Sequence, residues 1–456
     1  MKKYNLLKAK QLATLVLLVL VFFCKSASSQ CESLVVEDAS ATGSMYSIVR
    51  YLNNTTTVGY FQDYNNGYFV TIDIATGTIS AKSKIQQSGL FVSDFRILND
   101  TVYACGKYQE QGILMKFHVS YIGQYLNQFN YVVIDSTTEL TRMVVYNNTA
   151  TGNVEIIAIG YLEESIPPYL YHYYRVVDCK SLNNANYRVH TCYSSGIHNE
   201  RFFDIVLTEN YVGLVGSIGE STISLRKASR NSTNIFTGVF DTIYVYTFQD
   251  VEPGSRLHAT ELKGDSIAVA SYSAVSSNQF ETRIRQYNLL TMSMLFGYAI
   301  PTSTKSEPSE LSYNKRFSTF LMLEQLEVNG NPSLFEYQVV TQRPHSLGGL
   351  ESYYVSGFFA QSIASSPNNR TFTLAGGNKF AEKYVWNINY QSCFTKTRIS
   401  YHDLTPIGHT IIEDGYHGYD DTPNWETDYI QTYPLTSVQD CIHTSLFISG
   451  KEDENE

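Results

Sequence analysis

The feature that most restricts the fold of this chain is an internal repeat of about fifty residues. Short apolar segments recur along the sequence, and the last residue of each lies 47 to 56 positions before the last residue of the next. A near-constant period of this length is typical of architectures that stack one supersecondary unit many times. Seven segments align in this way: Thr55–Gly59, Val102–Gly106, Ile156–Gly160, Val212–Gly216, Ile267–Ser271, Phe320–Glu324 and Phe372–Gly376.

The sequence around each segment repeats as well. An apolar run that ends in a turn precedes it, as in Phe95–Leu98 followed by Asn99–Asp100, and a second run follows it, as in Ile113–Phe117. A fourth, less regular run closes most units, as in Tyr131–Asp135. Thr, Val, Ile, Tyr and Phe fill these runs, whereas Asn, Asp and Gly separate them, which is the pattern of strands and turns. Each unit therefore predicts four antiparallel strands.

This sevenfold arrangement resembles the β-propeller superfamily over about residues 45–400. The resemblance implies an all-β, seven-bladed β-propeller of four-stranded antiparallel blades. The aligned segments would then lie near the inner part of the ring, because a strand covered on both faces by neighbouring blades becomes continuously apolar. Five of the seven end in glycine, which permits close backbone approach there.

The repeat identifies an architecture and no functional family. The paired glycines of Kelch blades, the Trp-Asp ending of WD40 blades, the Asp-box of sialidases and the Tyr-Trp-Thr-Asp motif of receptor propellers are missing. The structural alternative is a string of β-sandwich domains of about a hundred residues each. The period favours the propeller, because it is half the length of a sandwich and repeats seven times.

Three parts of the chain are expected: a signal peptide at 1–29, the propeller at 30–401, and a C-terminal extension at 402–456 that packs on or closes the ring and ends in an acidic tail. The closing strand could come from this extension or from Cys31–Val36 at the other end.

The N-terminal segment has the order of a secretory signal peptide. Lysines come first, an apolar run from Leu12 to Phe23 follows, and the small polar stretch Ser26–Ser29 comes last. The run is shorter than the roughly 20 residues that a membrane span needs, so a cleaved signal is favoured over a retained anchor. Cys24 raises the alternative of a lipoprotein, but the bulky residues before it do not resemble a lipoprotein signal. We expect an exported protein, either periplasmic, cell-surface or secreted, with no transmembrane segment after signal removal.

The net charge restricts the partners of this protein, and its cysteines raise the question of disulfides. The formal net charge of −10 becomes −15 once the five lysines of residues 1–29 are removed, which argues against nucleic acid as a partner. Six cysteines remain, and export permits disulfides. The preferred pairs are Cys179 with Cys192, which bracket an expected hairpin, and Cys393 with Cys441, which would attach the tail to the body. Cys105 lies in an apolar strand and is expected to be a buried free thiol.

The densest group of functional side chains lies at 408–426. Imidazoles and carboxylates at short spacing could hold a divalent metal, and aromatic rings beside carboxylates suit a carbohydrate. The alternative is a solvated polar loop, since the spacing matches no established zinc motif. No cofactor other than this metal is suggested. The metal candidates are His409, Asp414 and His417, and the ligand-binding candidates are Tyr416, His417, Tyr419 and Trp425.

The sequence favours a binding or scaffolding propeller over an enzyme. There is no Gly-x-Ser-x-Gly, no phosphate-binding loop and no recognisable catalytic cysteine. We expect a face of the ring that binds a protein or a glycan through loops around the central channel. The alternative is an extracellular or periplasmic enzyme that cleaves polysaccharide or peptide at the channel mouth, and acids with a basic or histidine group pointing into the channel would favour it.

Overall fold

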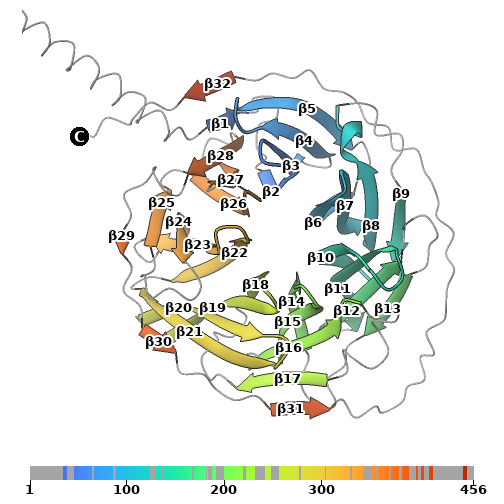
Figure 1. The fold of residues 1–456 in the computed structure, drawn as a ribbon, viewed down its shortest axis with the longest axis vertical. Helices are drawn as coiled ribbons and strands as arrows, with labels where there is room; N and C mark the ends of the chain where they lie inside the picture. The colour runs from blue at the N-terminus through green and yellow to red at the C-terminus, as the bar shows by residue number, and fades with distance from the viewer. Residues whose placement is uncertain are drawn as a thin grey trace, which may run out of the picture.

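The protein forms a ring of seven antiparallel sheets around a central axis (Figure 1). The computed structural model describes residues 34–37, the range 46–398 with short gaps in the connections, and the segments 402–404, 410–413 and 445–448. The predicted seven-bladed β-propeller with four-stranded antiparallel blades is confirmed. Apart from one 3-10 turn, η2 (Val119–Tyr121), all the described elements are strands, and none of the described residues belongs to a helix long and apolar enough to cross a membrane.

In six blades, four consecutive strands run from the centre of the ring outward. Blade 1 contains β2 (Tyr46–Tyr51), β3 (Thr56–Asp63), β4 (Asn66–Asp73) and β5 (Thr78–Ile85). Blade 2 contains β6 (Leu90–Leu98), β7 (Thr101–Tyr108), β8 (Gln111–His118) and β9 (Asn130–Ile134). Blade 3 contains β10 (Glu139–Asn147), β11 (Val154–Ile166), β12 (Tyr169–Lys180) and β13 (Tyr187–Thr191). Blade 4 contains β14 (Glu200–Leu207), β15 (Tyr211–Ile218), β16 (Thr222–Ser229) and β17 (Thr242–Thr247). Blade 5 contains β18 (His258–Glu261), β19 (Ser266–Ser276), β20 (Gln279–Asn288) and β21 (Ser293–Thr302). Blade 6 contains β22 (Ser306–Asn314), β23 (Thr319–Val328), β24 (Asn331–Gln342) and β25 (Glu351–Val355).

Blade 7 is built from both ends of the propeller. Its three inner strands are β26 (Phe358–Ser365), β27 (Thr371–Asn378) and β28 (Lys383–Asn389), and its fourth is β1 (Leu34–Glu37). Strand β1 pairs antiparallel with β28, with Val35 opposite Trp386. The ring therefore closes through a strand that precedes blade 1 in the sequence.

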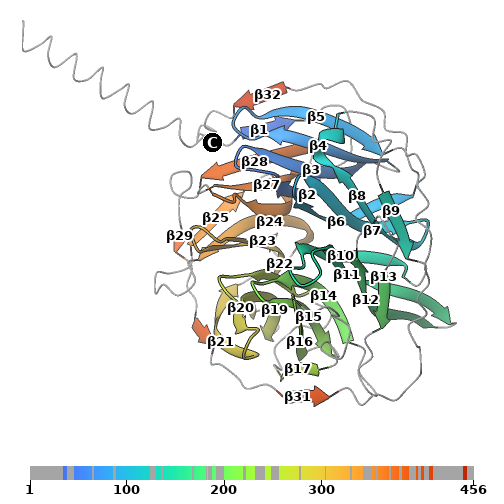
Figure 2. The ribbon, with the colours of Figure 1, turned by 45° about the vertical axis from the view of Figure 1, so that its right-hand side comes forward.

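Four short C-terminal strands add to the outer edges of blades (Figures 1 and 2). The first three follow the ring against the chain order: β29 (Thr397–Arg398) pairs with β25 of blade 6, β30 (His402–Leu404) with β21 of blade 5, and β31 (Thr410–Glu413) with β17 of blade 4. The fourth, β32 (Ser445–Ile448), pairs with β1 on blade 7. The described parts of 402–456 thus lie on the outside of the ring.

The repeated apolar segments form the second strand of each blade, one step out from the axis. Strand β15 is typical, since all but its first residue is buried. The turn expected at Asn99–Asp100 is a two-residue hairpin in which both residues have positive φ, 50° and 56°. Such turns match the twist of the strands that they join, and Asn and Asp tolerate this backbone conformation well.

The core lies between the faces of neighbouring blades and runs around the ring. One cluster joins blades 1 and 2 through residues such as Phe69, Phe95 and Phe117, whose rings pack at centroid distances of 4.9 to 5.6 Å. Similar clusters join each following pair through blade 6, and another joins blade 1 to blade 7. Burial on both faces explains why the second strands lack polar alternation.

One predicted disulfide is wrong. Cys179 is a buried free thiol, as Cys105 is, and the prediction for Cys105 is confirmed. The register of β12 and β13 gives the reason: Cys179 lies opposite Tyr187, whereas Thr191, the residue before Cys192, lies opposite Arg175. Four residues of strand separate the two places, about 13 Å at the usual rise, which is too far for a disulfide. Cys393 and Cys441 lie outside the described residues.

Candidate functional site

Two cavities occupy the channel inside the seven innermost strands. The first, which we name the hairpin chamber, has a volume of about 360 Å³ and lies where the inner strands end, beside residues such as Tyr51, Ile97 and Tyr313. The second, the bulge chamber, has a volume of about 440 Å³ and lies where the inner strands begin. Arg50, Arg142, His258 and Glu310 line both cavities, so this charged layer lies between the chambers.

The inner strand of six blades contains a β-bulge near its start. A bulge leaves one residue without a partner and re-aims its side chain. Gly106, Gly160 and Gly216 lie on the second strand opposite the residue before the bulge, and a Cβ there would overlap a carbonyl oxygen of the inner strand. This is the close approach that the recurring glycine predicted, although in blade 1 the matching residue is Phe61 and not Gly59. The bulged residues are Ser47, Ser93, Thr141, Phe203, Ser309 and Gln361.

The residue after the bulge connects neighbouring blades. Each inner strand is the edge of its sheet, so the N–H groups that it turns to the channel have no strand partner. At four junctions a side-chain oxygen of the preceding blade accepts a hydrogen bond from such an N–H group. These bonds join Met143 N to Asp94 Oδ2 (3.2 Å), Ala259 N to Asp204 Oδ2 (2.9 Å), Ile363 N to Glu310 Oε2 (2.7 Å) and Val49 N to Ser362 Oγ (3.2 Å).

Two of these carboxylates also bind arginine. Asp94 is fully buried and contacts Arg50 Nη2 at 3.0 Å and Arg96 Nη2 at 3.2 Å, and Arg50 Nη1 reaches Glu310 at 3.0 Å. Burial opposes the charge of Asp94, but the guanidinium groups of Arg96 and Arg50 outweigh it and hold the pKa of the carboxyl below its usual value. Arg50 therefore connects blade 1 to blades 2 and 6.

Asp204 has a different environment, although it occupies the same place on blade 4. Its oxygens accept bonds from Ala259 N and Ile205 N, both at 2.9 Å. Burial raises the pKa of its carboxyl, and Arg142 with these two N–H groups offsets only part of that effect. Asp204 thus holds a proton more readily than Asp94 does.

Three nitrogen-bearing side chains of the channel have no such partner. Arg142, Arg256 and His258 make no hydrogen bond or ion pair with any residue that the structure describes. Burial works against the charge of Arg142, but Asp204 and more distant carboxylates raise the pKa of its guanidinium. Burial first, and then Arg142 and Arg256, lower the pKa of His258 to about 3, so its imidazole is neutral at neutral pH.

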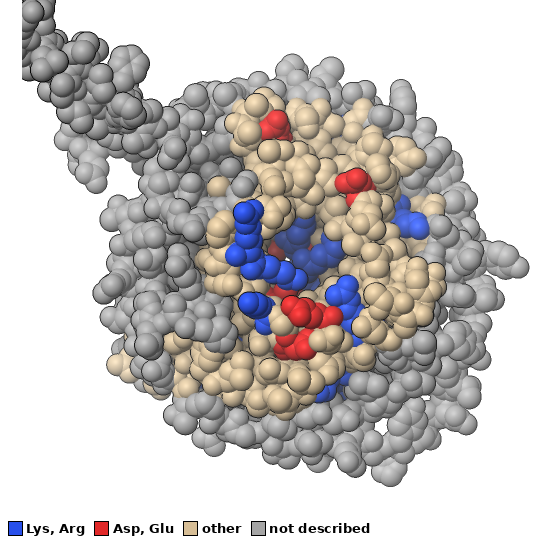
Figure 3. Space-filling view, viewed as in Figure 1, with Lys and Arg blue, Asp and Glu red and all other residues tan. Residues whose placement is uncertain are grey.

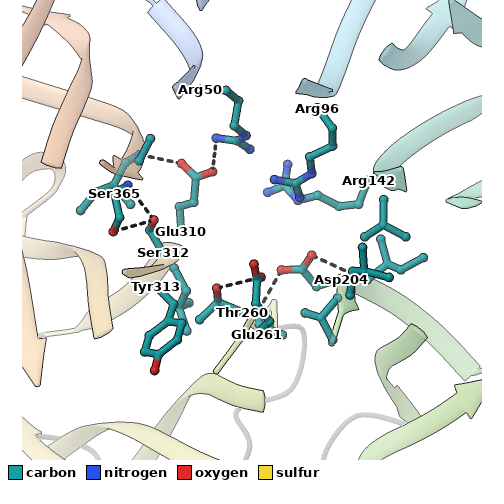
Figure 4. A pocket seen from close by; sticks show the side chains of 18 of the residues that line it. Arg50, Arg96, Arg142, Asp204, Thr260, Glu261, Glu310, Ser312, Tyr313 and Ser365 are labelled. Atoms are coloured by element: carbon teal, nitrogen blue, oxygen red, sulfur yellow. Dashed lines mark hydrogen bonds and ion pairs between the residues drawn. The ribbon is translucent and has the colours of Figure 1, made fainter. Parts of the chain in front are cut away.

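The charges of the hairpin chamber are separated by side. Arg50, Arg96 and Arg142 come from blades 1 to 3, and they face Asp204, Glu261 and Glu310 of blades 4 to 6 (Figure 4). Figure 3 shows the hollow at the centre of the ring with basic and acidic side chains gathered in and around it. The rim acid Glu261 lies 3.6 Å from Lys315.

The channel is not the site expected from the sequence, and the expected site stays a prediction. Its metal and ligand candidates lie outside the described residues, and the strand β31 between His409 and Asp414 pairs on the outer edge of blade 4. In the described part of the chain, no group of three His, Cys, Asp or Glu side chains is arranged to hold a metal ion. The undescribed candidates are His409, Asp414, Tyr416, His417, Tyr419 and Trp425.

Comparisons with known proteins identify no family for this chain. No family model matches the sequence, and no curated protein matches it. Among solved structures, the chain is similar to hydrazine synthase of Kuenenia stuttgartiensis (10% identity, 79% of this chain and 97% of that chain, TM-score 0.45). It is also similar to the Dos1 propeller (9%, 79% and 96%, TM-score 0.41) and to Raptor of Chaetomium thermophilum (10%, 80% and 30%, TM-score 0.43). At such identities none of these likenesses bears on function.

Proposed function

We propose that this protein is an exported binding propeller, and that its protein or glycan ligand places an acidic group in the hairpin chamber. The observation that carries the proposal is the guanidinium of Arg142, which faces the chamber without a hydrogen bond or ion pair to any described residue. Arg96 adds further donors beside it. Its Nε donates to Met143 O at 3.0 Å and its Nη2 contacts Asp94, and its other N–H groups remain for a ligand. Guanidinium groups suit carboxylates, which they bind through two parallel hydrogen bonds.

The engagement of the carboxylates favours binding over catalysis. Asp94, Asp204 and Glu310 each accept a backbone N–H from the next blade, so they hold the ring together at its inner edge. A carboxylate that must keep these bonds is poorly placed to attack a substrate or to exchange protons with it. The positive groups are the ones left over for a ligand.

Export rests on the order of charged, apolar and small polar residues in 1–29, which lie outside the described residues. Expression of the full chain in a bacterium, followed by fractionation and mass determination, tests it. A chain that appears outside the cytoplasm and begins near Gln30 supports export, whereas an intact Met1 on a cytoplasmic chain contradicts it.

The binding proposal is tested with arrays of acidic and neutral oligosaccharides and peptides. Arg96→Gln removes a cation that lines only the hairpin chamber, and Arg316→Gln is the matched control, because Arg316 lies at the hairpin that joins β22 to β23, outside the chamber. We expect retained ligands to be acidic, to bind at least tenfold more weakly to the Arg96→Gln protein, and to bind unchanged to the control. Ligands that bind the wild type and the Arg96→Gln protein equally would refute the chamber as the site.

A second candidate function, an enzyme that cleaves polysaccharide or peptide, is favoured by the acids that line the channel together with His258. Asp204 is its candidate acid, which would have to give up the hydrogen bond from Ala259 N. Its pKa is raised by burial, as a general acid requires, and it lies in the chamber near the acid Glu261. The test is turnover of the ligands found on the arrays. Cleavage that disappears in a folded Asp204→Asn protein would establish the enzyme, whereas ligands recovered intact would leave the binding function.

A further inference from the structure

The bulge chamber is a second cavity, and the repeated β-bulge shapes its wall. Four of the six bulged residues line it, and all four are polar: Ser47, Ser93, Ser309 and Gln361. A bulge turns a side chain out of the ordinary alternation of a strand, and such bulges are common beside binding sites. The same irregularity in successive blades thus brings polar side chains to the cavity, where the hydroxyls of Ser47 and Ser309 donate to carbonyls of the second strand at 3.3 Å and that of Ser93 donates to Glu139 at 2.8 Å.

The chamber also contains charge that the protein leaves unpaired. Two of its acids are engaged, because Glu310 binds Arg50 at 3.0 Å and Glu307 binds Lys305 at 2.7 Å. Arg142 and Arg256 line the same cavity and make no hydrogen bond or ion pair with a described residue. Two guanidinium groups therefore remain for an anion.

The polar groups beside these arginines include free hydrogen-bonding amides. Gln325 and Gln361 line the chamber and make no hydrogen bond with a described residue. An amide both donates and accepts, so it can bind a hydroxyl group in either sense. Gln361 and Arg256 are exposed to solvent, so the chamber is open to the surface, and its volume of about 440 Å³ is in the usual range of small-molecule sites.

We propose that the bulge chamber binds a sugar acid, with the carboxylate between Arg142 and Arg256 and the hydroxyl groups on Gln325 and Gln361. Paired guanidinium groups recognise the carboxylate, and the amides recognise the ring. The neutral imidazole of His258 lies in the same lining and can offer a donor or an acceptor there.

This site shares Arg142 with the hairpin chamber, but the second arginine of each site is different. Arg256 lines only the bulge chamber and Arg96 lines only the hairpin chamber. A sugar acid that fails to bind while an Arg96-dependent ligand still binds would remove this inference and leave the proposed function. A sugar acid that binds while no Arg96-dependent ligand is found would remove the proposed function and leave this inference.

Calorimetric titration of the full mature chain with D-glucuronate tests the proposal. We expect D-glucuronate to bind at least a hundredfold more tightly than D-glucose, which lacks the carboxylate, and tenfold more tightly than acetate, which lacks the hydroxyls. Arg256→Gln should weaken D-glucuronate binding at least tenfold, while Arg316→Gln should leave it unchanged. Arg256 is exposed and makes no hydrogen bond or ion pair to a described residue, so its replacement should not unfold the ring.

Each of the other outcomes overturns the proposal. Equal affinity for D-glucose and D-glucuronate removes the carboxylate from the recognition, and equal affinity for acetate removes the sugar. Tighter binding of glucose 6-phosphate than of D-glucuronate assigns the two arginines to a phosphate. Wild-type affinity in the Arg256→Gln protein places the ligand elsewhere.

Discussion

Replacing Asp94 with asparagine should destabilise the ring by about 3 to 5 kcal/mol, the usual result of removing one partner from a buried ion pair. The Asp94 carboxylate is fully buried and accepts from Arg50 at 3.0 Å, from Arg96 at 3.2 Å and from Met143 N at 3.2 Å. Asparagine keeps one acceptor oxygen and turns an NH₂ group toward the arginines or toward Met143 N–H. The substitution therefore leaves buried donors without acceptors, removes the acidic partner of Arg96 and leaves Arg50 paired with Glu310 alone.

Urea denaturation of the wild type and the Asp94→Asn protein measures this loss, with an unchanged m-value as the check that the two transitions are comparable. The matched control is Glu110→Gln, because Glu110 binds Lys107 at 2.6 Å but its side chain is 79% exposed. An exposed pair contributes less than about 1 kcal/mol. If Asp94→Asn costs no more than this control, the charged network is not what holds the inner ring together.

The effect of Asp94 should also depend on pH in a defined direction. Its folded-state pKa is below the value of an unfolded aspartate, because Arg96 and Arg50 overcome the effect of burial. The stabilisation is therefore complete above the unfolded pKa, near 3.9, and is lost as the pH falls through the folded pKa. The stability difference between wild type and Asp94→Asn should shrink in that window, and a difference that grows on acidification would contradict the assignment.

Three further perturbations test other parts of the argument. Gly160→Ala should lower the free energy of unfolding by about 3 kcal/mol, because the new Cβ would overlap the backbone carbonyl of Glu139. Gly152 faces open space at φ 70°, so Gly152→Ala should lower it by only about 1 kcal/mol. Equal shifts of the urea midpoint in the two variants would refute the clash. As the pH falls from 7.5 to 5.5, His258 should lower the free energy of unfolding by about 1.4 kcal/mol, because only the unfolded chain binds a proton on this imidazole. The His258→Gln protein should lack this part of the pH dependence, and equal slopes in the two proteins would contradict a folded-state pKa of about 3. Burial raises the pKa of the Cys179 thiol to about 12, so a thiol reagent should label Cys179 only when the protein unfolds, and rapid labelling of the native protein would show that the thiol is accessible.

The architecture could be predicted from the sequence because the blade is a local unit. Turn residues such as Asn99 and Asp100, and the apolar second strands, are specified by neighbours close in sequence. Details of register were harder. In blade 1 the segment ending at Gly59 resembles the others, yet Phe61 lies opposite the residue before the bulge, because side-chain pattern alone does not fix how two strands align.

The channel could not be predicted because its residues are far apart in the sequence and meet only when the ring closes. Arg50 binds Asp94 and Glu310, and the three residues lie on three different blades. A signal was nevertheless present, since a polar or charged residue interrupts the apolar inner strand at one matched place in most blades, as Asp94, Asp204 and Glu310 do. A dense local cluster of functional side chains, such as residues 408–426, is easier to detect in a sequence than single residues repeated at a distance.

The pairing of β1 with β28 determines the order in which this molecule can finish folding. Strand β1 is made near the start of synthesis, and the residues that it pairs with, Trp386 and Asn387, are made near the end. This contact of high sequence separation therefore forms after the blades between its partners, and loop-closure entropy makes such a contact slow. Until then both β1 and the edge of blade 7 are unpaired, so a chain halted before β28 exposes two open strand edges and is prone to aggregate.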